Sequence, residues 1–296
     1  MKRNLKWAGI AIGSILALVI IVALVMMLIG GSRFNRTYDF PVTAVNVPTD
    51  PASIERGKHF VEAIAICQVC HGDNLAGNTM VDNPAFARIV ASNLTSGRGG
   101  IGGTYSDIDY VRAIRHGVGN DGKGLPLMPS EAFNKFSDPD LGAIIAYLKS
   151  LPPVDNEVPE SKAGPIGRIF ALLDSSLFSV QLIDHEAPRA PAASPGVTEE
   201  YGAYLATGCT VCHGQNLGGA RIFIVEGSPD SANLTSGGEL GSWSESDFIN
   251  TLRTGVTPKG KLLNPNFMPW NRFRLMTDDE IKAIWLHVRA LPPIVP

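Results

Sequence analysis

Two short stretches of the sequence, CQVCHG at residues 67–72 and CTVCHG at residues 209–214, carry the residue types most suited to chemistry. They contain all four cysteines of the chain, so no cysteine is left for a disulfide framework or a free thiol. Two cysteines separated by two residues and followed directly by a histidine have the spacing of covalent haem attachment. Each stretch therefore predicts one haem c, held by thioethers and by an imidazole on the iron. The predicted residues are Cys67, Cys70, His71, Cys209, Cys212 and His213.

Two other uses of paired cysteines compete with this interpretation. A thioredoxin-like redox pair needs a reactive thiolate in a strand–helix context and requires no histidine after the pair. A four-thiolate zinc site normally has its ligand pairs joined by a short loop, whereas these pairs lie 142 residues apart. Because a histidine follows both pairs, a chance match is negligible and haem attachment is favoured.

The two halves of the chain repeat one pattern, offset by 138 to 142 residues. After the first motif come NLTSG, a GG-T-Y-S-D segment, RHGV, LMP and a segment ending in SLPPV. After the second come NLTSG, LGSWSESD, RTGV, FMP and a segment ending in ALPPI. The repetition predicts two domains of the same design.

Three helices are expected in each half. The first runs into the cysteine motif, the second begins at a capping box and ends at a glycine, and the third carries an apolar stripe and ends at Leu-Pro-Pro. No alternating run predicts a strand, so the expected fold is all-α with long loops. The residues expected to begin these helices are Asp50, Ser106 and Ser137 in the first half and Thr198, Ser244 and Thr277 in the second.

The sixth ligand of each iron must come from outside the motifs. Met128 and Met268 occupy matching positions, 61 and 59 residues after the first cysteine of each motif, and proline follows both. A core methionine is the commoner role for this residue type, but the matched spacing favours axial ligation. The predicted iron ligands are therefore His71 and Met128 in the first half and His213 and Met268 in the second. Four histidines, none repeated in the other half, are competing ligands: His59, His116, His185 and His287.

Three further pairs recur at matched positions. The Asn-Leu-Thr triplets at 93–95 and 233–235 fit a glycosylation pattern, but their repetition favours a structural loop or one that contacts a haem propionate. Tyr105 pairs with Trp243 and Arg115 with Arg253. These side chains could hydrogen-bond to propionates or form ion pairs with them, although solvated arginines are as compatible with the pattern.

The N-terminus contains an uncharged stretch from Trp7 to Gly30, long enough as a helix to cross a hydrocarbon core of about 30 Å. Lys2, Arg3 and Lys6 precede it, which predicts an inside N-terminus and an outer location for everything after Arg33. A cleaved signal peptide would have a shorter apolar region and an A-x-A-like site. A retained single-pass anchor is therefore expected.

The length and net charge of the chain limit its number of domains and its partners. At 296 residues the chain has room for about two domains, and its net charge of −3 gives no basic footprint for nucleic acid. The apolar segment IGRIFALLDSSLFSVQLI lacks a counterpart in the second half and could pack on a domain or on the membrane. The expected organisation is a membrane anchor at 1–32, a linker at 33–50, a first domain at 51–156, a connector at 157–194 and a second domain at 195–296.

The two haem motifs, each followed in order by NLT, R-x-GV, MP and LPP segments, resemble those of tandem class I cytochromes c. They are similar to the motifs of the cytochrome c subunits of membrane-bound alcohol and aldehyde dehydrogenases. The resemblance implies an all-α fold of two class I domains after a transmembrane helix, with two covalently bound haem c groups. It also implies thioether, proximal and distal roles for the cysteines, histidines and methionines above. Such a protein would lie in the bacterial cytoplasmic membrane with its haem domains on the periplasmic face.

Three functions are compatible with a protein that carries two haem c groups. A carrier that relays single electrons to or from an oxidase, reductase or dehydrogenase would have two six-coordinate haems and no reaction of its own. A haem enzyme, such as a di-haem peroxidase or a thiosulfate-oxidising cytochrome, needs an open iron, which the matched methionines disfavour. A haem sensor needs an output domain, and none is visible in the sequence. The electron carrier is the favoured hypothesis.

Overall fold

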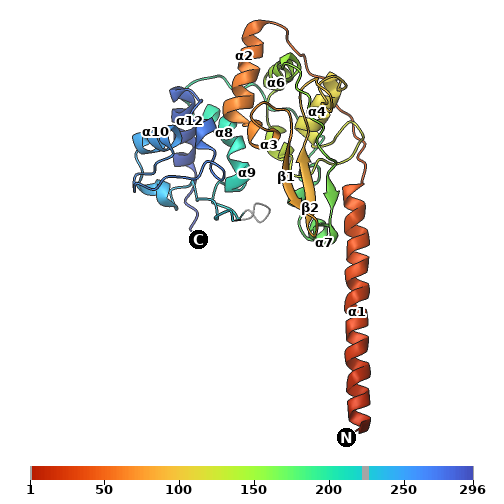
Figure 1. The fold of residues 1–296 in the computed structure, drawn as a ribbon. Helices are drawn as coiled ribbons and strands as arrows, with labels where there is room; N and C mark the ends of the chain where they lie inside the picture. Colours follow the sequence, from red (N-terminus) through yellow and green to blue (C-terminus); the bar gives the residue numbers. More distant parts are fainter. Residues whose placement is uncertain (1, 222–226, 296) are drawn as a thin grey trace.

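The structure is a computed structural model that describes residues 2–221 and 227–295. A long N-terminal helix leads into two helical units that lie side by side (Figure 1). The helices of the first part are α1 (Lys2–Phe34), α2 (Pro51–His59), α3 (Gln68–His71), α4 (Asp107–His116), α5 (Ser130–Phe133) and α6 (Asp138–Ser150). After the connecting helix α7 (Pro165–Leu173) come α8 (Glu199–Leu205), α9 (Thr210–His213), α10 (Glu245–Thr254), α11 (Trp270–Phe273) and α12 (Asp278–Ala290).

Short turns complete the helical framework. A π-helical turn, η1 (Phe60–Ile64), continues α2 toward the first cysteine motif, and a 3₁₀ turn, η4 (Ala206–Gly208), continues α8 toward the second. Three more 3₁₀ turns lie in the connector and the second unit: η2 (Ser175–Leu177), η3 (Ser179–Gln181) and η5 (Glu239–Ser242). Both motifs thus sit at the end of a helical segment, as the sequence predicted.

Capping sets the ends of the repeated helices as predicted. Ser106 and Ser244 form capping boxes with Asp109 and Asp247, which satisfy free backbone N–H groups at the starts of α4 and α10. Both helices end at a left-handed glycine, with φ of 68° and 74°. Thr277 caps α12 in the same way, and the side chains of Asp50, Ser137 and Thr198 cap α2, α6 and α8.

In each unit the first and last helices cross at a glycine. A Cβ atom on Gly57 of α2 would lie 1.9 Å from the carbonyl oxygen of Ala143 in α6. A Cβ atom on Gly202 of α8 would lie 1.8 Å from the carbonyl oxygen of Ala283 in α12. Non-bonded carbon and oxygen atoms cannot approach each other so closely, so both crossings require a residue without a Cβ atom, which is glycine.

A small sheet corrects the expectation of an all-α fold. Strands β1 (Asn78–Asn83), β2 (Ala87–Ala91) and β3 (Lys162–Ala163) pair antiparallel in the order β1-β2-β3. The sequence pattern missed them because β1 is largely exposed, contains a register shift and has no apolar face, while β2 buries only Ala87 and Ile89. The fold is mostly helical, with this sheet beside the first unit.

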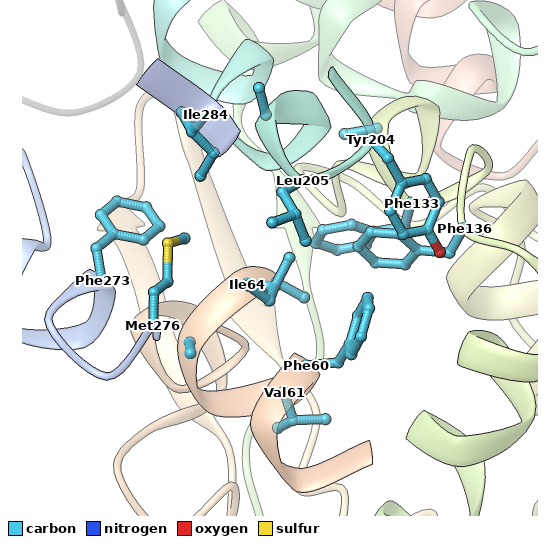
Figure 2. Close-up of a cluster of buried hydrophobic side chains, with 14 of the residues drawn as sticks. Phe60, Val61, Ile64, Phe133, Phe136, Tyr204, Leu205, Phe273, Met276 and Ile284 are labelled. Carbon is cyan, nitrogen blue, oxygen red and sulfur yellow. The ribbon is translucent and has the colours of Figure 1, made fainter. Parts of the chain in front are cut away.

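The two units share one hydrophobic core. Phe60 of the first unit meets Phe136 edge-on at 5.5 Å between ring centroids and Tyr204 of the second unit at 6.4 Å. Leu205 and Ile284 of the second unit lie in the same buried cluster (Figure 2). The units therefore contact each other through buried apolar side chains, while the domain limits given above stay a prediction.

The connector packs on the first unit. Its β3 extends the sheet, and α7 lies against the end of α1. Helix α1 is long and apolar enough to cross a membrane, with a mean hydropathy of 3.1 in its most apolar window, and most of its length is free of contacts with the rest of the chain.

Candidate functional site

Each cysteine motif folds into a single helical turn that ends in a histidine. Cys67 and Cys209 stand at the N-caps of α3 and α9, and the turns close when the amides of His71 and His213 donate to the carbonyls of those cysteines, both at 2.9 Å. A glycine with φ near 80° follows each histidine and turns the chain away. This geometry places both cysteines and the histidine of a motif on one turn.

A backbone carbonyl fixes the orientation of each histidine ring. The Nδ1 of His71 lies 2.8 Å from the oxygen of Ser92, and the Nδ1 of His213 lies 2.7 Å from the oxygen of Ala232. Because a carbonyl only accepts, Nδ1 must carry the proton and donate it. The Nε2 of each ring is left with its lone pair, which is the arrangement a metal-binding histidine needs.

The repeated asparagines hold the loops that provide these carbonyls. Asn93 is fully buried; its Oδ1 accepts from the amide and the hydroxyl of Thr95 at 2.9 and 2.8 Å, and its Nδ2 donates to the oxygen of Val154 at 2.8 Å. Asn233 makes the same bonds to Thr235 and to the oxygen of Ile294. The triplets are therefore structural, and the burial of Asn93 leaves its amide inaccessible to glycosylation.

A pocket in the first unit brings three predicted haem residues together. Cys67, His71 and Met128 all line it, although Met128 lies 61 residues after Cys67. Apolar side chains form most of the remaining wall: Ala65, Leu94, Ile101, Tyr110, Ile114, Phe133, Ile144 and Leu148. A thiol, an imidazole with a free Nε2 and a thioether around an apolar cavity fit a porphyrin and its iron.

The second unit repeats these positions. His213 is buried, and Cys209, Met268 and Trp243 pack against the shared core. Met268 directly precedes Pro269, the N-cap of the short helix α11, just as Met128 directly precedes Pro129, the N-cap of α5. The roles of the two methionines as iron ligands stay predictions.

Burial makes the motif cysteines poor thiolates. It raises the pKa of the Cys67 and Cys209 thiols to about 12 and, together with the nearby Cys212, that of Cys70 to about 11. A thioredoxin-like cysteine needs a lowered pKa, so this alternative is disfavoured. Among residues 2–221 and 227–295, no three His, Cys, Asp or Glu side chains are grouped closely enough to hold a metal ion, which also disfavours a four-thiolate zinc site.

The competing histidines lie elsewhere. His59 contacts both carboxylate oxygens of Glu280 at 2.9 Å, and His116 contacts His185 at 2.8 Å between their Nδ1 atoms. His287 lies on α12. None of these four lines the pocket of the first unit.

The matched arginines have a structural role that the sequence did not reveal. Arg115 donates to a carboxylate oxygen of Asp138 at 2.7 Å and to the carbonyl of Phe136 at 2.8 Å. Arg253 donates to the carbonyl of Met276 at 2.7 Å and to Asp278 at 2.5 Å. Each arginine ties the end of α4 or α10 to the start of the last helix of its unit. Tyr105, by contrast, lines the pocket as a haem-contacting residue would.

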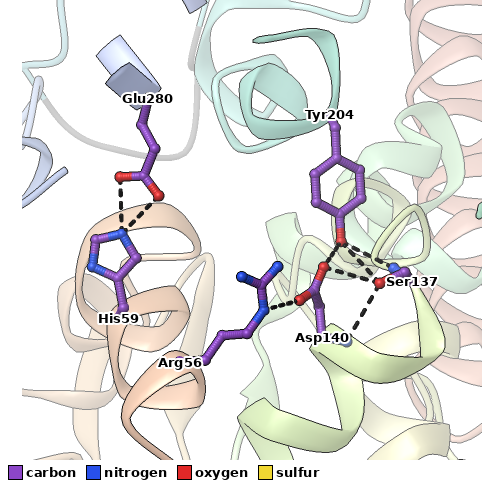
Figure 3. A network of polar contacts seen from close by, with 6 residues as sticks. All are labelled: Arg56, His59, Ser137, Asp140, Tyr204 and Glu280. Carbon is purple, nitrogen blue, oxygen red and sulfur yellow. Dashed lines mark hydrogen bonds and ion pairs between the residues drawn. The ribbon is translucent and has the colours of Figure 1, made fainter. Parts of the chain in front are cut away.

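Sequence reasoning missed a polar network between the units (Figure 3). The buried Asp140 of α6 accepts from Arg56 of α2 at 2.6 Å and from the hydroxyl of Tyr204 in the second unit. The contact of His59 with Glu280 lies beside it and also joins the two units. No sequence signal could have paired these residues, because the contacts depend on how the units are placed.

Comparisons with known families match each unit separately. The family described as cytochrome c matches residues 200–292, and the family described as cytochrome c oxidase, cbb3-type, subunit III matches residues 52–148. The matches begin close to α8 and α2 and end close to α12 and α6. Each unit of the fold is thus recognised as a cytochrome c domain.

Several relatives cover most of this chain. It is 31% identical to a nicotinate dehydrogenase subunit of Pseudomonas putida over 85% of its length, but that alignment covers 22% of the relative. It is 28% identical to the fructose dehydrogenase cytochrome subunit of Gluconobacter japonicus, covering 83% of this chain and 55% of the relative. It is 26% identical to the gluconate 2-dehydrogenase cytochrome c subunit of Pantoea cypripedii, covering 86% and 63%. The chain therefore spans less than two thirds of the length of each of these relatives.

Two cytochrome c domains imply two covalently bound haem c groups, and the cysteine pairs 67/70 and 209/212 fit their attachment. The oriented histidines and the apolar pocket agree with this cofactor. The chain therefore carries two cytochrome c domains in tandem, one in each unit of the fold.

Proposed function

We propose that this protein relays single electrons between its two haem c groups, as a membrane-anchored cytochrome subunit working with a dehydrogenase or another respiratory partner. The observation that carries the proposal is that the two haem-attachment motifs face one shared interface. Haem groups attached on either side of this interface would be close enough for an electron to pass from one to the other within the protein.

The interface is reciprocal. The turn η1, which leads into the first motif, packs against α11 of the second unit, and η4, which leads into the second motif, packs against α5 of the first. A Cβ atom on Gly208 would lie 2.9 Å from the carbonyl oxygen of Ile64, and Arg272 of α11 forms an ion pair with Asp73, just after the first motif. Cys212 contributes to the raised pKa of the Cys70 thiol, which is a further sign that the two motifs lie near each other.

Both α5 and α11 begin two residues after a methionine predicted to bind iron. The carbonyl of Met128 accepts from the amide of Ser130 at 2.8 Å and from the hydroxyl of Ser179. The carbonyl of Met268 accepts from the amide of Trp270 at 2.7 Å. These bonds hold the methionine backbones, so each thioether would be presented to its iron by a rigid segment that also contacts the other unit.

When bound, haem c supplies a one-electron Fe(III)/Fe(II) couple. The chain would contribute Cys67, Cys70, Cys209 and Cys212 as thioether anchors, His71 and His213 as proximal ligands, and Met128 and Met268 as distal ligands. If a histidine and a methionine both bound each iron, no site would remain for a substrate, which favours electron transfer over a haem enzyme. The apolar pocket walls would keep water from the porphyrin and so raise the potential.

The relatives suggest the partner. Those named above as cytochrome subunits belong, by their names, to fructose and gluconate dehydrogenases, so a dehydrogenase is the first partner to test for this chain. The exposed apolar helix α1 would anchor the protein in a bacterial cytoplasmic membrane. The positive charges before α1 favour an inside N-terminus, with both haem domains on the periplasmic face.

The ligand assignment can be tested by replacing Met128 or Met268 with alanine. Each variant should keep two covalent haems but lower the potential of one and open its iron to carbon monoxide, as followed by absorption spectroscopy. Met80→Ala in the first unit is the control, since this half-buried methionine lies outside the predicted ligand positions and outside the core cluster. Unchanged potentials in the first two variants, or carbon monoxide binding caused by the control, would refute the assignment.

A further inference from the structure

Helix α7 has one buried face and one exposed apolar face. Its sequence, PIGRIFALL, contains a single charged residue. Gly167 and Ala171 are buried, and a Cβ atom on Gly167 would lie 2.0 Å from the carbonyl oxygen of Phe86, so this face is fixed to the turn between β1 and β2. Ile166 is 58% exposed and Leu173 is 74% exposed. The half-buried Ile169 and Phe170 lie between them at helical spacing, so these side chains form one continuous apolar face of the kind that marks a contact surface.

Helix α7 is docked rigidly on the last turns of α1. Gly30 is buried there, because a Cβ atom on it would lie 1.7 Å from the carbonyl oxygen of Arg168. The guanidinium of Arg33 donates to the carbonyl of Ala171 at 2.7 Å. The two helices are drawn side by side where α1 meets the first unit (Figure 1).

The contact reaches into the apolar part of α1. Residues 3–22 of α1 are all exposed, and the first residues with partial cover are Ala23, Met26 and Met27, at helical spacing with Gly30. Among the described elements, α7 makes by far the most contacts with α1. Seven residues of helix correspond to about 10 Å, so α7 stands beside a region extending about 10 Å inward from Gly30.

We propose that α7 lies in the lipid–water interface of the membrane that α1 crosses, with Ile166 and Leu173 among the acyl chains. This inference rests on the proposed anchoring by α1. An interfacial helix typically buries its apolar face by about 5–10 Å, which matches the depth reached beside α1. Three arginines, Arg33, Arg36 and Arg168, lie at or next to this junction, where anionic lipid headgroups would attract them.

The consequence is a fixed height for both haem domains. The first unit is fixed to α7 through the sheet, and the second unit is fixed to the first through the shared core. The membrane would therefore set the orientation of the whole protein rather than tether it by a flexible linker, and partner proteins in the same membrane would meet a constant face of it.

The test uses the full-length, haem-loaded protein in vesicles of phosphatidylcholine and phosphatidylglycerol. All four native cysteines would be held in thioethers, so an added cysteine is the free thiol for a nitroxide spin label. Ile166→Cys and Leu173→Cys report on α7. Leu18→Cys reports on the middle of α1, and Leu262→Cys, at a site 65% exposed in the second unit, reports on water. Power saturation compares relaxation by oxygen, which concentrates in lipid, with relaxation by a water-soluble nickel chelate.

The inference predicts that the ratio of relaxation by oxygen to relaxation by the nickel chelate is lipid-like at both α7 positions. This ratio should be several-fold higher there than at position 262. Water-like values at 166 and 173, together with a lipid-like value at 18, would overturn the inference and leave the anchor standing. A water-like value at 18 would overturn the anchor and the inference together. Unchanged haem absorption in each labelled variant establishes that its fold is intact.

Discussion

Replacing Asn93 with alanine tests how the chain holds its proximal histidine. Asn93 is fully buried and clamps the loop whose Ser92 carbonyl accepts from the ring of His71. Alanine removes the acceptor for the amide of Thr95 and the donor to the oxygen of Val154. The loop should loosen, and the histidine ring should lose its fixed orientation.

The size of the effect follows from which groups lose their partners. The hydroxyl of Thr95 already lies 3.1 Å from the oxygen of Val154, so these two groups can satisfy each other in the variant. The buried backbone N–H of Thr95, by contrast, loses its acceptor, and an unsatisfied buried donor costs about 1–3 kcal/mol. Adding about 1 kcal/mol for the small cavity left by the amide gives a loss of about 2–4 kcal/mol in the free energy of unfolding.

Guanidinium unfolding of the detergent-solubilised protein, followed through the haem absorption, measures this loss. Asn120→Ala, on an exposed loop, is the control and should change stability by less than about 0.5 kcal/mol. Redox titration should also show a changed potential for the first haem and an unchanged one for the second. The reasoning would be refuted if Asn93→Ala matched the control, or if stability fell while the first haem kept its potential and its spectrum.

Two further predictions concern packing and pH. Gly57→Ala should lower the free energy of unfolding by about 3 kcal/mol, and the thermal midpoint with it, because the added Cβ would lie 1.9 Å from the α6 backbone. Gly103→Ala is the control, because a Cβ there has its nearest atom at 3.7 Å. Equal thermal midpoints for the two variants would contradict the helix crossing. Burial, and then His185, lower the pKa of His116 from 6.5 to about 3. Since only the unfolded chain takes up this proton between those values, stability should fall as pH drops below about 6.5, by about 2 kcal/mol at pH 5. His116→Gln should remove that part of the slope in denaturant titrations at pH 7 and 5, and an unchanged slope would refute the assignment.

Much of the local structure could be predicted because its causes are local. A capping box needs only residues three positions apart, and the repeat supplied each signal twice, so the starts of α4 and α10 and their glycine ends were correct. The same repetition selected Met128, which the fold brings into the pocket with His71. A single methionine without its matched partner would have been indistinguishable from a core residue.

The remainder depends on contacts between distant segments. Strand β1 is exposed and irregular, so its pairing could not be read from an alternating pattern. Gly57 and Gly202 did give a signal, a glycine inside the first helix of each half, which helix propensity alone makes unfavourable. Asp140 and Tyr204 gave none, because a buried carboxylate bonded across two units is defined only by how those units meet.

Low-temperature EPR of the full-length protein tests the central claim most directly. Two adjacent haem c groups with histidine and methionine ligands predict two low-spin ferric signals per chain, broadened by each other and simplified when one haem is reduced. A high-spin signal, or two signals that do not change when the other haem is reduced, would contradict a relay between six-coordinate haems across the shared interface.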